Sequence, residues 1–263
     1  MPTTTTTPVP RTSTVPARTA TMLIALFRAE ARLFLRDPVT VLIAVLLPAG
    51  ILAGLGSVPA LRDPDPMFGG VTFVAYFAPS LLAITITQLG LQTLPTGLAT
   101  YRENGVLRRF SASPVSPAAV LAVQLLISLI TAAAATLLLV AVAVLVFGVP
   151  APQHPVQFAL ALLLGLAAVF SIGLLIAAVA PRARTAGGIG ALAFVLTLFF
   201  AGVYLPNFLL PELIVRIGAY VPPGIAAIKD SWTGAGADPV VLLVMAAVAV
   251  GATAGAARLF RWE

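Results

Sequence analysis

The sequence predicts an all-α, polytopic membrane protein with six transmembrane helices, an N-terminal amphipathic interfacial helix and a short re-entrant element before the last span. Of its 263 residues, 60% are hydrophobic and 9% are charged, against roughly 45–50% apolar and about 25% charged in soluble domains. The apolar residues form separate runs close to the ~20 residues that a helix needs to cross a bilayer. We therefore expect lipid to be the solvent for most of the chain.

Residues 1–21 are rich in Thr and Pro and lack the apolar centre of a signal peptide, so they are expected to be a disordered cytosolic tail. Residues 22–37 form the predicted interfacial helix. Its basic face carries Arg28, Arg32 and Arg36, four residues apart. The opposite, apolar face carries Leu23, Leu26, Phe27, Leu33 and Phe34.

The remaining residues, 38–263, are predicted to form one six-span domain. The six spans are expected at Val39–Val58, Val71–Ala99, Ala118–Phe147, Val156–Ala180, Ala186–Leu205 and Pro239–Ala257. Three helix starts are marked by a capping residue followed by proline, at Asp37-Pro38, Ser116-Pro117 and Asp238-Pro239.

The basic residues predict the orientation in a bacterial cytoplasmic membrane. With both termini in the cytosol, cytosolic segments hold twelve of the fifteen basic residues, and only Arg62, Arg216 and Lys229 lie outside. Cytoplasmic loops are generally enriched in Lys and Arg, which favours this orientation over its inverse.

Residues 206–230 are apolar but are interrupted by Pro206, Pro211 and Pro222, so they are not expected to make a further crossing. A short helix near Pro211–Tyr220 that dips into the outer leaflet and returns is one interpretation. A helix on the outer surface is the other.

The residue types point away from an enzyme and from nucleic acid as a partner. There is no cysteine, and the only histidine, His154, lies in a short loop where we expect it to be solvated, so no catalytic residue and no metal site is predicted. The net charge of +6 comes from residues scattered at span ends rather than from a basic patch. A phosphate-binding loop needs a lysine, and the single lysine, Lys229, follows Ile228 in an outer segment.

Charged residues fall outside all six predicted spans, which is unlike a carrier coupled to protons or sodium. The second and third spans instead carry stripes of uncharged polar residues, which serve either as a translocation path or as hydrogen-bonding contacts between helices. These residues are Thr85, Gln88, Gln92, Thr96, Gln124, Ser128 and Thr131. Two Gly pairs, Gly50 with Gly54 and Gly251 with Gly255, suit close helix packing within the chain, and the first pair also suits a dimer seam.

The cytosolic segment 101–117, YRENGVLRRFSASPVSP, has charges of both signs and a helix-breaking Gly105. Such a polar elbow can dock on another protein. Anchoring to lipid head groups explains Arg108 and Arg109 but not Glu103, which anionic lipid would repel.

This pattern resembles the type-2 permeases of ATP-binding cassette (ABC) exporters, of the daunorubicin and multidrug-resistance kind, over nearly the whole chain. The elbow carries the family pattern Y-R-E-x-G-x-L-x-R. Its residues here are Tyr101, Arg102, Glu103, Gly105, Leu107 and Arg109. A proline-broken element before the last span also matches, more loosely, through Pro206, Pro211 and Pro222.

The resemblance implies a permease without catalytic activity that exports an amphiphilic drug-like or lipid-like substrate. It implies two permease copies, joined at the first and fifth spans, and two ATPase subunits that carry ATP and Mg; this chain would bind no cofactor. The elbow would seat in a groove of the ATPase. A non-transporting assembly or scaffold protein and an ion-coupled secondary carrier are the alternatives.

Overall fold

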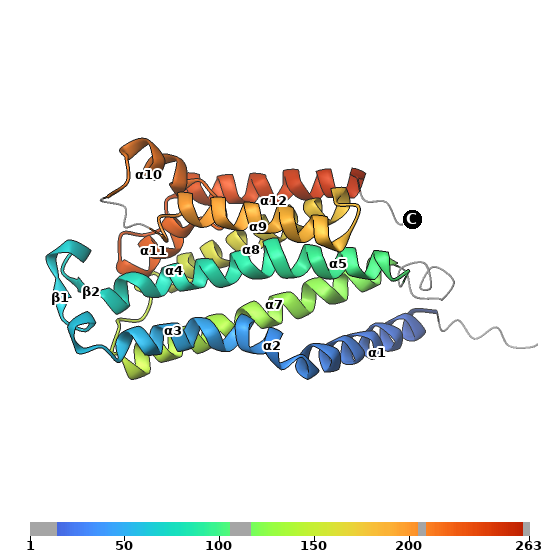
Figure 1. The fold of residues 1–263 in the computed structure, drawn as a ribbon, viewed down its shortest axis with the longest axis horizontal. Helices are drawn as coiled ribbons and strands as arrows, with labels where there is room; N and C mark the ends of the chain where they lie inside the picture. Colours follow the sequence, from blue (N-terminus) through green and yellow to red (C-terminus); the bar gives the residue numbers. More distant parts are fainter. Residues whose placement is uncertain (1–14, 106–116, 205–208, 260–263) are drawn as a thin grey trace, which may run out of the picture.

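The protein folds as an elongated bundle of roughly aligned helices (Figure 1). The structure is a computed structural model that describes residues 15–105, 117–204 and 209–259. Within them, six helices are long and apolar enough to cross a membrane. They run over Pro38–Gly56, Phe73–Glu103, Ala119–Val146, Pro155–Val179, Ala183–Phe200 and Pro239–Leu259. The predicted all-α class with six spans is confirmed.

The first three spans each contain a π-helical turn. The first span comprises α2 (Pro38–Val41), a π turn (Leu42–Leu46) and α3 (Leu47–Gly56). The second comprises α4 (Phe73–Thr87), a π turn (Gln88–Thr93) and α5 (Leu94–Glu103), and the third comprises α7 (Pro117–Ala141) and a π turn (Val142–Val146). The other spans are α8 (Pro155–Val179), α9 (Ala183–Phe200) and α12 (Pro239–Leu259).

Two of the predicted helix starts have the expected caps. The side chain of Asp37 accepts hydrogen bonds from the Thr40 hydroxyl at 2.5 Å and from the Thr40 amide at 3.2 Å, and Pro38 is the first residue of α2. These two bonds favour the charged carboxylate and hold the pKa of Asp37 below its usual range. At the sixth span, the side chain of Asp238 accepts from the amide of Val240 at 2.8 Å.

The second span lies at the centre of the bundle. In its most apolar stretch 72% of the residues are buried, against 17% in the fifth and sixth spans. Its π turn lies against α8 and α9, where a Cβ added to Gly173 would overlap the carbonyl oxygen of Gly90, and one added to Gly190 that of Leu91. Glycine at these two positions therefore lets the backbones touch.

One end of the bundle holds α1 (Val15–Arg36), the end of α5 and the end of α12 (Figure 1). The interfacial helix α1 begins at Val15, before the predicted residue 22. Its contacts are mainly with α7 and α2.

The opposite end holds a hairpin of β1 (Pro64–Asp65) and β2 (Val71–Thr72), together with α10 (Glu212–Ala219) and α11 (Ile225–Thr233) (Figure 1). His154 is not solvated as expected. It is half-buried, and its Nε2 lies 3.1 Å from the carbonyl oxygen of Gly234, joining the loop before α8 to the loop after α11.

Candidate functional site

Tyr101, the first residue of the predicted elbow, belongs to the last turn of α5 and points back into the protein. Its hydroxyl donates a hydrogen bond to Oε2 of Glu30 on α1 at 2.7 Å. Gln124 on α7 donates to the same carboxylate oxygen at 2.9 Å and to the Tyr101 hydroxyl at 3.1 Å. Three helices from separate parts of the chain thus meet in one polar cluster.

Arg102 joins the same turn to the end of the fourth span. Its guanidinium donates to the carbonyl oxygen of Ala177 at 3.3 Å and to that of Ala180, the residue that caps α8. The last carbonyl groups of a helix lack partners in their own helix and carry partial negative charge. Arg102 therefore serves as a cationic cap for α8.

Glu103 and Gly105 lie at the end of this turn. Glu103 ends α5 and is exposed. Gly105 has a φ of +64°, in the left-handed region that other residues adopt at a cost, and its amide bonds to the Arg102 carbonyl at 3.1 Å. The predicted helix break at Gly105 is thus present, while Leu107 and Arg109 lie outside the described residues.

Glu30 was missed by the sequence reasoning. It is the only acidic residue in α1, and it lies two positions from Arg28, which places it on the far side of the helix from the arginines. Arg28, Arg32 and Arg36 are all exposed, as expected, whereas Phe27 and Phe34 are partly buried. A single carboxylate on the apolar face of a helix needs hydrogen-bond donors from elsewhere in the protein. Its position in the sequence could therefore have indicated a polar contact with another helix.

A groove runs between the first, second and fifth spans and has a polar and an apolar part. We call it the membrane groove. Its polar part, nearer the α1 end, is lined by Thr40, Gln88, Gln92, Thr93, Thr96 and Gly187. Its apolar part is lined by Leu47, Pro48, Ile51, Leu81, Ile84, Thr85 and Phe194. Ile43, Ala44 and Gln88 line both parts, so the two parts adjoin.

The polar side chains predicted on the second and third spans lie in different environments. Gln88, Gln92 and Thr96 from the second span line the polar part of the groove, and the Thr96 hydroxyl also bonds to the Gln92 carbonyl at 2.5 Å. Thr85 and Thr131 are buried and donate to carbonyl groups of their own helices. Ser128 is buried, and Gln124 belongs to the Glu30 cluster. The third-span stripe therefore contributes to helix contacts rather than to the groove.

The paired glycines of the first span face open space. A Cβ added to Gly50 or Gly54 would meet nothing within 4 Å, so neither is used for packing within the chain. Gly251 is equally open, whereas Gly255 faces Leu175.

The proline-rich element forms two helices, where one was predicted. Pro211 caps α10, which matches the expected helix, and Pro222 lies in the turn before α11; Pro206 is outside the described residues. Helix α11 packs on α8 and α4 and buries Ile228 and Trp232. The glycines that flank it, Gly224 and Gly234, are the sequence signal that could have revealed it.

Six apolar helices with polar side chains aimed between them define a multi-pass helical membrane protein. The family model of the ABC-2 type transporter matches residues 21–228, which is most of the chain, so the protein belongs to this family. It is the permease component of an ABC transporter, which works with a separate ABC ATP-binding subunit. Searches of curated proteins and of solved structures gave no match.

Proposed function

We propose that this permease exports an amphiphilic, drug-like or lipid-like substrate across a bacterial cytoplasmic membrane, as in multidrug efflux and antibiotic resistance. The observation that carries the proposal is the membrane groove. Its polar part, with Gln88 and Gln92, adjoins its apolar part. A ligand with a polar and an apolar end matches this distribution, because buried polar groups need hydrogen-bond partners and apolar surface does not.

Two permease copies form the exporter in this proposal, with the first and fifth spans at the seam. The first span is little buried, the fifth is among the least buried, and Gly50 and Gly54 leave room for a second backbone. Two grooves would then face each other across the seam. The translocation path would be completed by the second copy.

The energy comes from two ATP-binding subunits that carry ATP and Mg, and this chain binds neither. With both termini and the elbow in the cytosol, Glu103 and Gly105 face the ATPase. Tyr101 and Arg102 pass its movement to α1, α7 and α8 through the hydrogen bonds described above. The helices α10 and α11 form the re-entrant outer element.

The test is co-purification with the candidate ATPase, followed by a screen for substrates that stimulate ATP hydrolysis. Gln92→Ala should weaken stimulation by an amphiphile, since it removes a polar group of the groove. Gln153→Ala, which changes an exposed glutamine before α8, is the matched control. Equal stimulation of the wild type and Gln92→Ala by every active amphiphile would contradict a role for the groove.

A further inference from the structure

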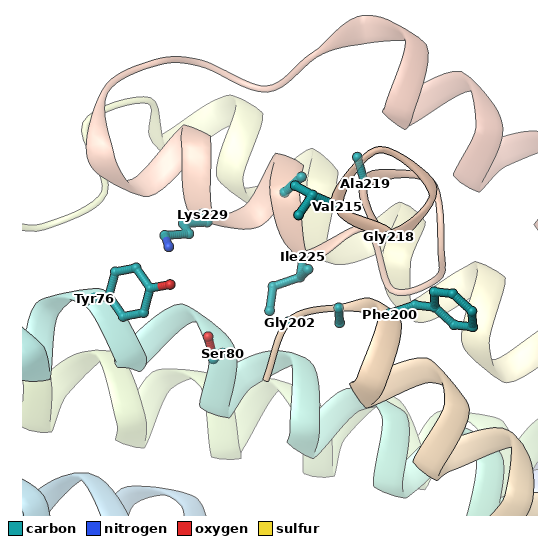
Figure 2. A pocket seen from close by; sticks show the side chains of 11 residues that line it. Tyr76, Ser80, Phe200, Gly202, Val215, Gly218, Ala219, Ile225 and Lys229 are labelled. Carbon is teal, nitrogen blue, oxygen red and sulfur yellow. The ribbon is translucent and has the colours of Figure 1, made fainter. Parts of the chain in front are cut away.

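A second, smaller hollow lies at the opposite end of the bundle from α1, between α4, the end of α9, α10 and α11 (Figure 2). We call it the Lys229 pocket; Tyr76, Ser80, Gly218, Ile225 and Lys229 are among its walls. Its volume is about 80 Å³. One water occupies about 30 Å³ of liquid and drug-sized sites exceed about 300 Å³, so the pocket suits a group of a few heavy atoms.

Lys229 is the only lysine of the chain and supplies a cation to this pocket. Its Nζ lies 3.4 Å from the centre of the Tyr76 ring, and Figure 2 shows the side chain reaching down from α11 toward that ring. In the part of the chain that the structure describes, Lys229 forms no ion pair, and Glu212 of α10 pairs with Arg216. The ammonium group therefore has no anionic partner in direct contact.

Ser80 adds a hydroxyl that opens onto the pocket. The residue is 7% exposed, and its side chain points from α4 into the pocket. Thr85 and Thr87, on the same helix, each donate to a carbonyl group one turn earlier, but within the described residues Ser80 makes no hydrogen bond. No buried side-chain oxygen of the described residues lacks a partner, so this hydroxyl is accessible from the pocket and free to hydrogen-bond to a ligand there.

Burial lowers the pKa of Lys229 to about 8, although the neighbouring Asp230 opposes this shift. A bound anion would raise this pKa again, because an opposite charge nearby favours the charged form.

The pocket borders both kinds of helix end. The first turn of α11, at Ile225 and Ala226, carries partial positive charge, whereas the ends of α9 and α10, at Phe200 and Ala219, carry partial negative charge. The ammonium group and the hydroxyl are therefore the groups that favour an oxyanion.

We infer that the Lys229 pocket binds one oxyanion group, such as a phosphate, either free or on the head group of a lipid-like amphiphile. The apolar walls contributed by Phe200, Val215 and Ile225 would contact the part of an amphiphile next to its head group. The inference rests on the proposed function only in placing the pocket at the outer membrane surface.

The test uses the purified full chain in detergent, without any ATPase, so it can succeed or fail independently of transport. The probes are dioctanoyl-phosphatidylglycerol, dioctanoylglycerol, which lacks the phosphate, and sodium phosphate, each titrated by isothermal calorimetry. We expect the wild type to bind phosphatidylglycerol more tightly than dioctanoylglycerol. Lys229→Gln should weaken binding of phosphatidylglycerol by about tenfold or more, as expected for loss of a charged hydrogen bond.

Arg216→Gln is the matched control, because it removes one exposed positive charge from the same end of the bundle and should leave binding unchanged. Ser80→Ala is a second, milder variant that keeps the charge and should weaken binding less than Lys229→Gln does.

Binding of sodium phosphate that depends on Lys229 would identify a free oxyanion as a sufficient ligand, whereas binding of phosphatidylglycerol alone would identify a lipid head group. If Lys229→Gln and Ser80→Ala bind both phosphate probes as the wild type does, or if the wild type binds neither, the inference is wrong.

Discussion

Tyr101 donates a hydrogen bond of 2.7 Å to the carboxylate of Glu30, a residue 71 positions earlier in the chain. The bond ties the last turn of the second span to the amphipathic helix α1, and Gln124 extends it to α7. The neighbouring Arg102 ties the same turn to the end of α8. A displacement of the elbow is therefore shared by four helices.

Tyr101→Phe should loosen this connection while leaving the apolar packing of the ring in place. The loss of one hydrogen bond to a carboxylate is expected to cost about 1–3 kcal/mol of stability. In proteoliposomes with the ATPase, substrate moved per ATP hydrolysed should fall. Tyr220→Phe, at an exposed tyrosine of the other end, should change neither quantity. Unchanged coupling in Tyr101→Phe would show that the Glu30 cluster is structural only.

Variants of Glu103 and Gly105 test whether the elbow docks on the ATPase. Glu103→Arg should weaken co-purification with the ATPase, because like charges across an interface cost energy. Gly105→Pro should do the same, since proline cannot adopt a φ of +64°. Asp63→Arg reverses an exposed charge at the opposite end and should have no effect. Wild-type co-purification and export in both elbow variants would exclude a docking role for this turn.

The orientation can be tested with single cysteines, since the chain has none. Asn104→Cys and Asp63→Cys both lie at exposed positions, at opposite ends of the bundle. An impermeant maleimide added to intact cells should label Asp63→Cys but not Asn104→Cys, and both should react after the cells are opened. The reverse pattern would invert the proposed topology.

The dimer seam can be tested by oxidative cross-linking. Gly54→Cys should form a disulfide-linked dimer in membranes, because its position faces open space on a span with little burial. Gly251→Cys is a suitable control, since it is equally open but lies on the sixth span, away from the proposed seam. Cross-linking through Gly251→Cys and not through Gly54→Cys would place the seam elsewhere.

The spans were predictable because lipid imposes a strong and local rule: long apolar runs, ended by proline, glycine or charge. Asp37 with Pro38 marked a helix start for the same local reason, since cap and first residue are neighbours in sequence. Only one wall of the membrane groove was predictable from the sequence. The stripe of Gln88, Gln92 and Thr96 is visible on one helix, but which spans cover it depends on packing.

The Glu30 cluster and α11 were not predicted. Tyr101, Glu30 and Gln124 come together only through the tertiary fold, and no local pattern pairs them. Helix α11 is short and follows prolines that indicate a break, yet it is held by burial of Ile228 and Trp232 against the bundle. Tertiary packing here outweighs local helix preference, as it commonly does.

The Lys229 pocket leads to a prediction about pH. Only the protonated lysine attracts an anion, and burial sets its pKa at about 8 in the unliganded protein. The affinity of the wild type for dioctanoyl-phosphatidylglycerol should therefore be nearly constant below about pH 7 and should decrease as the pH rises through 8. The ionisable groups that face Lys229 are the Tyr76 phenol of α4 and the neighbouring Asp230, which Asp238 in turn affects; on α10, which also lines the pocket, Glu212 and Arg216 pair with each other.

Lys229→Arg distinguishes titration of the lysine from titration of these neighbouring groups, because arginine keeps its charge at every pH in this range. Its affinity should be independent of pH between 7 and about 9.5, whether or not the larger side chain binds as tightly. Calorimetric titrations at four pH values, with wild type and variant in the same detergent, measure both curves. If the two proteins lose affinity in parallel as the pH rises, a group other than Lys229 controls binding.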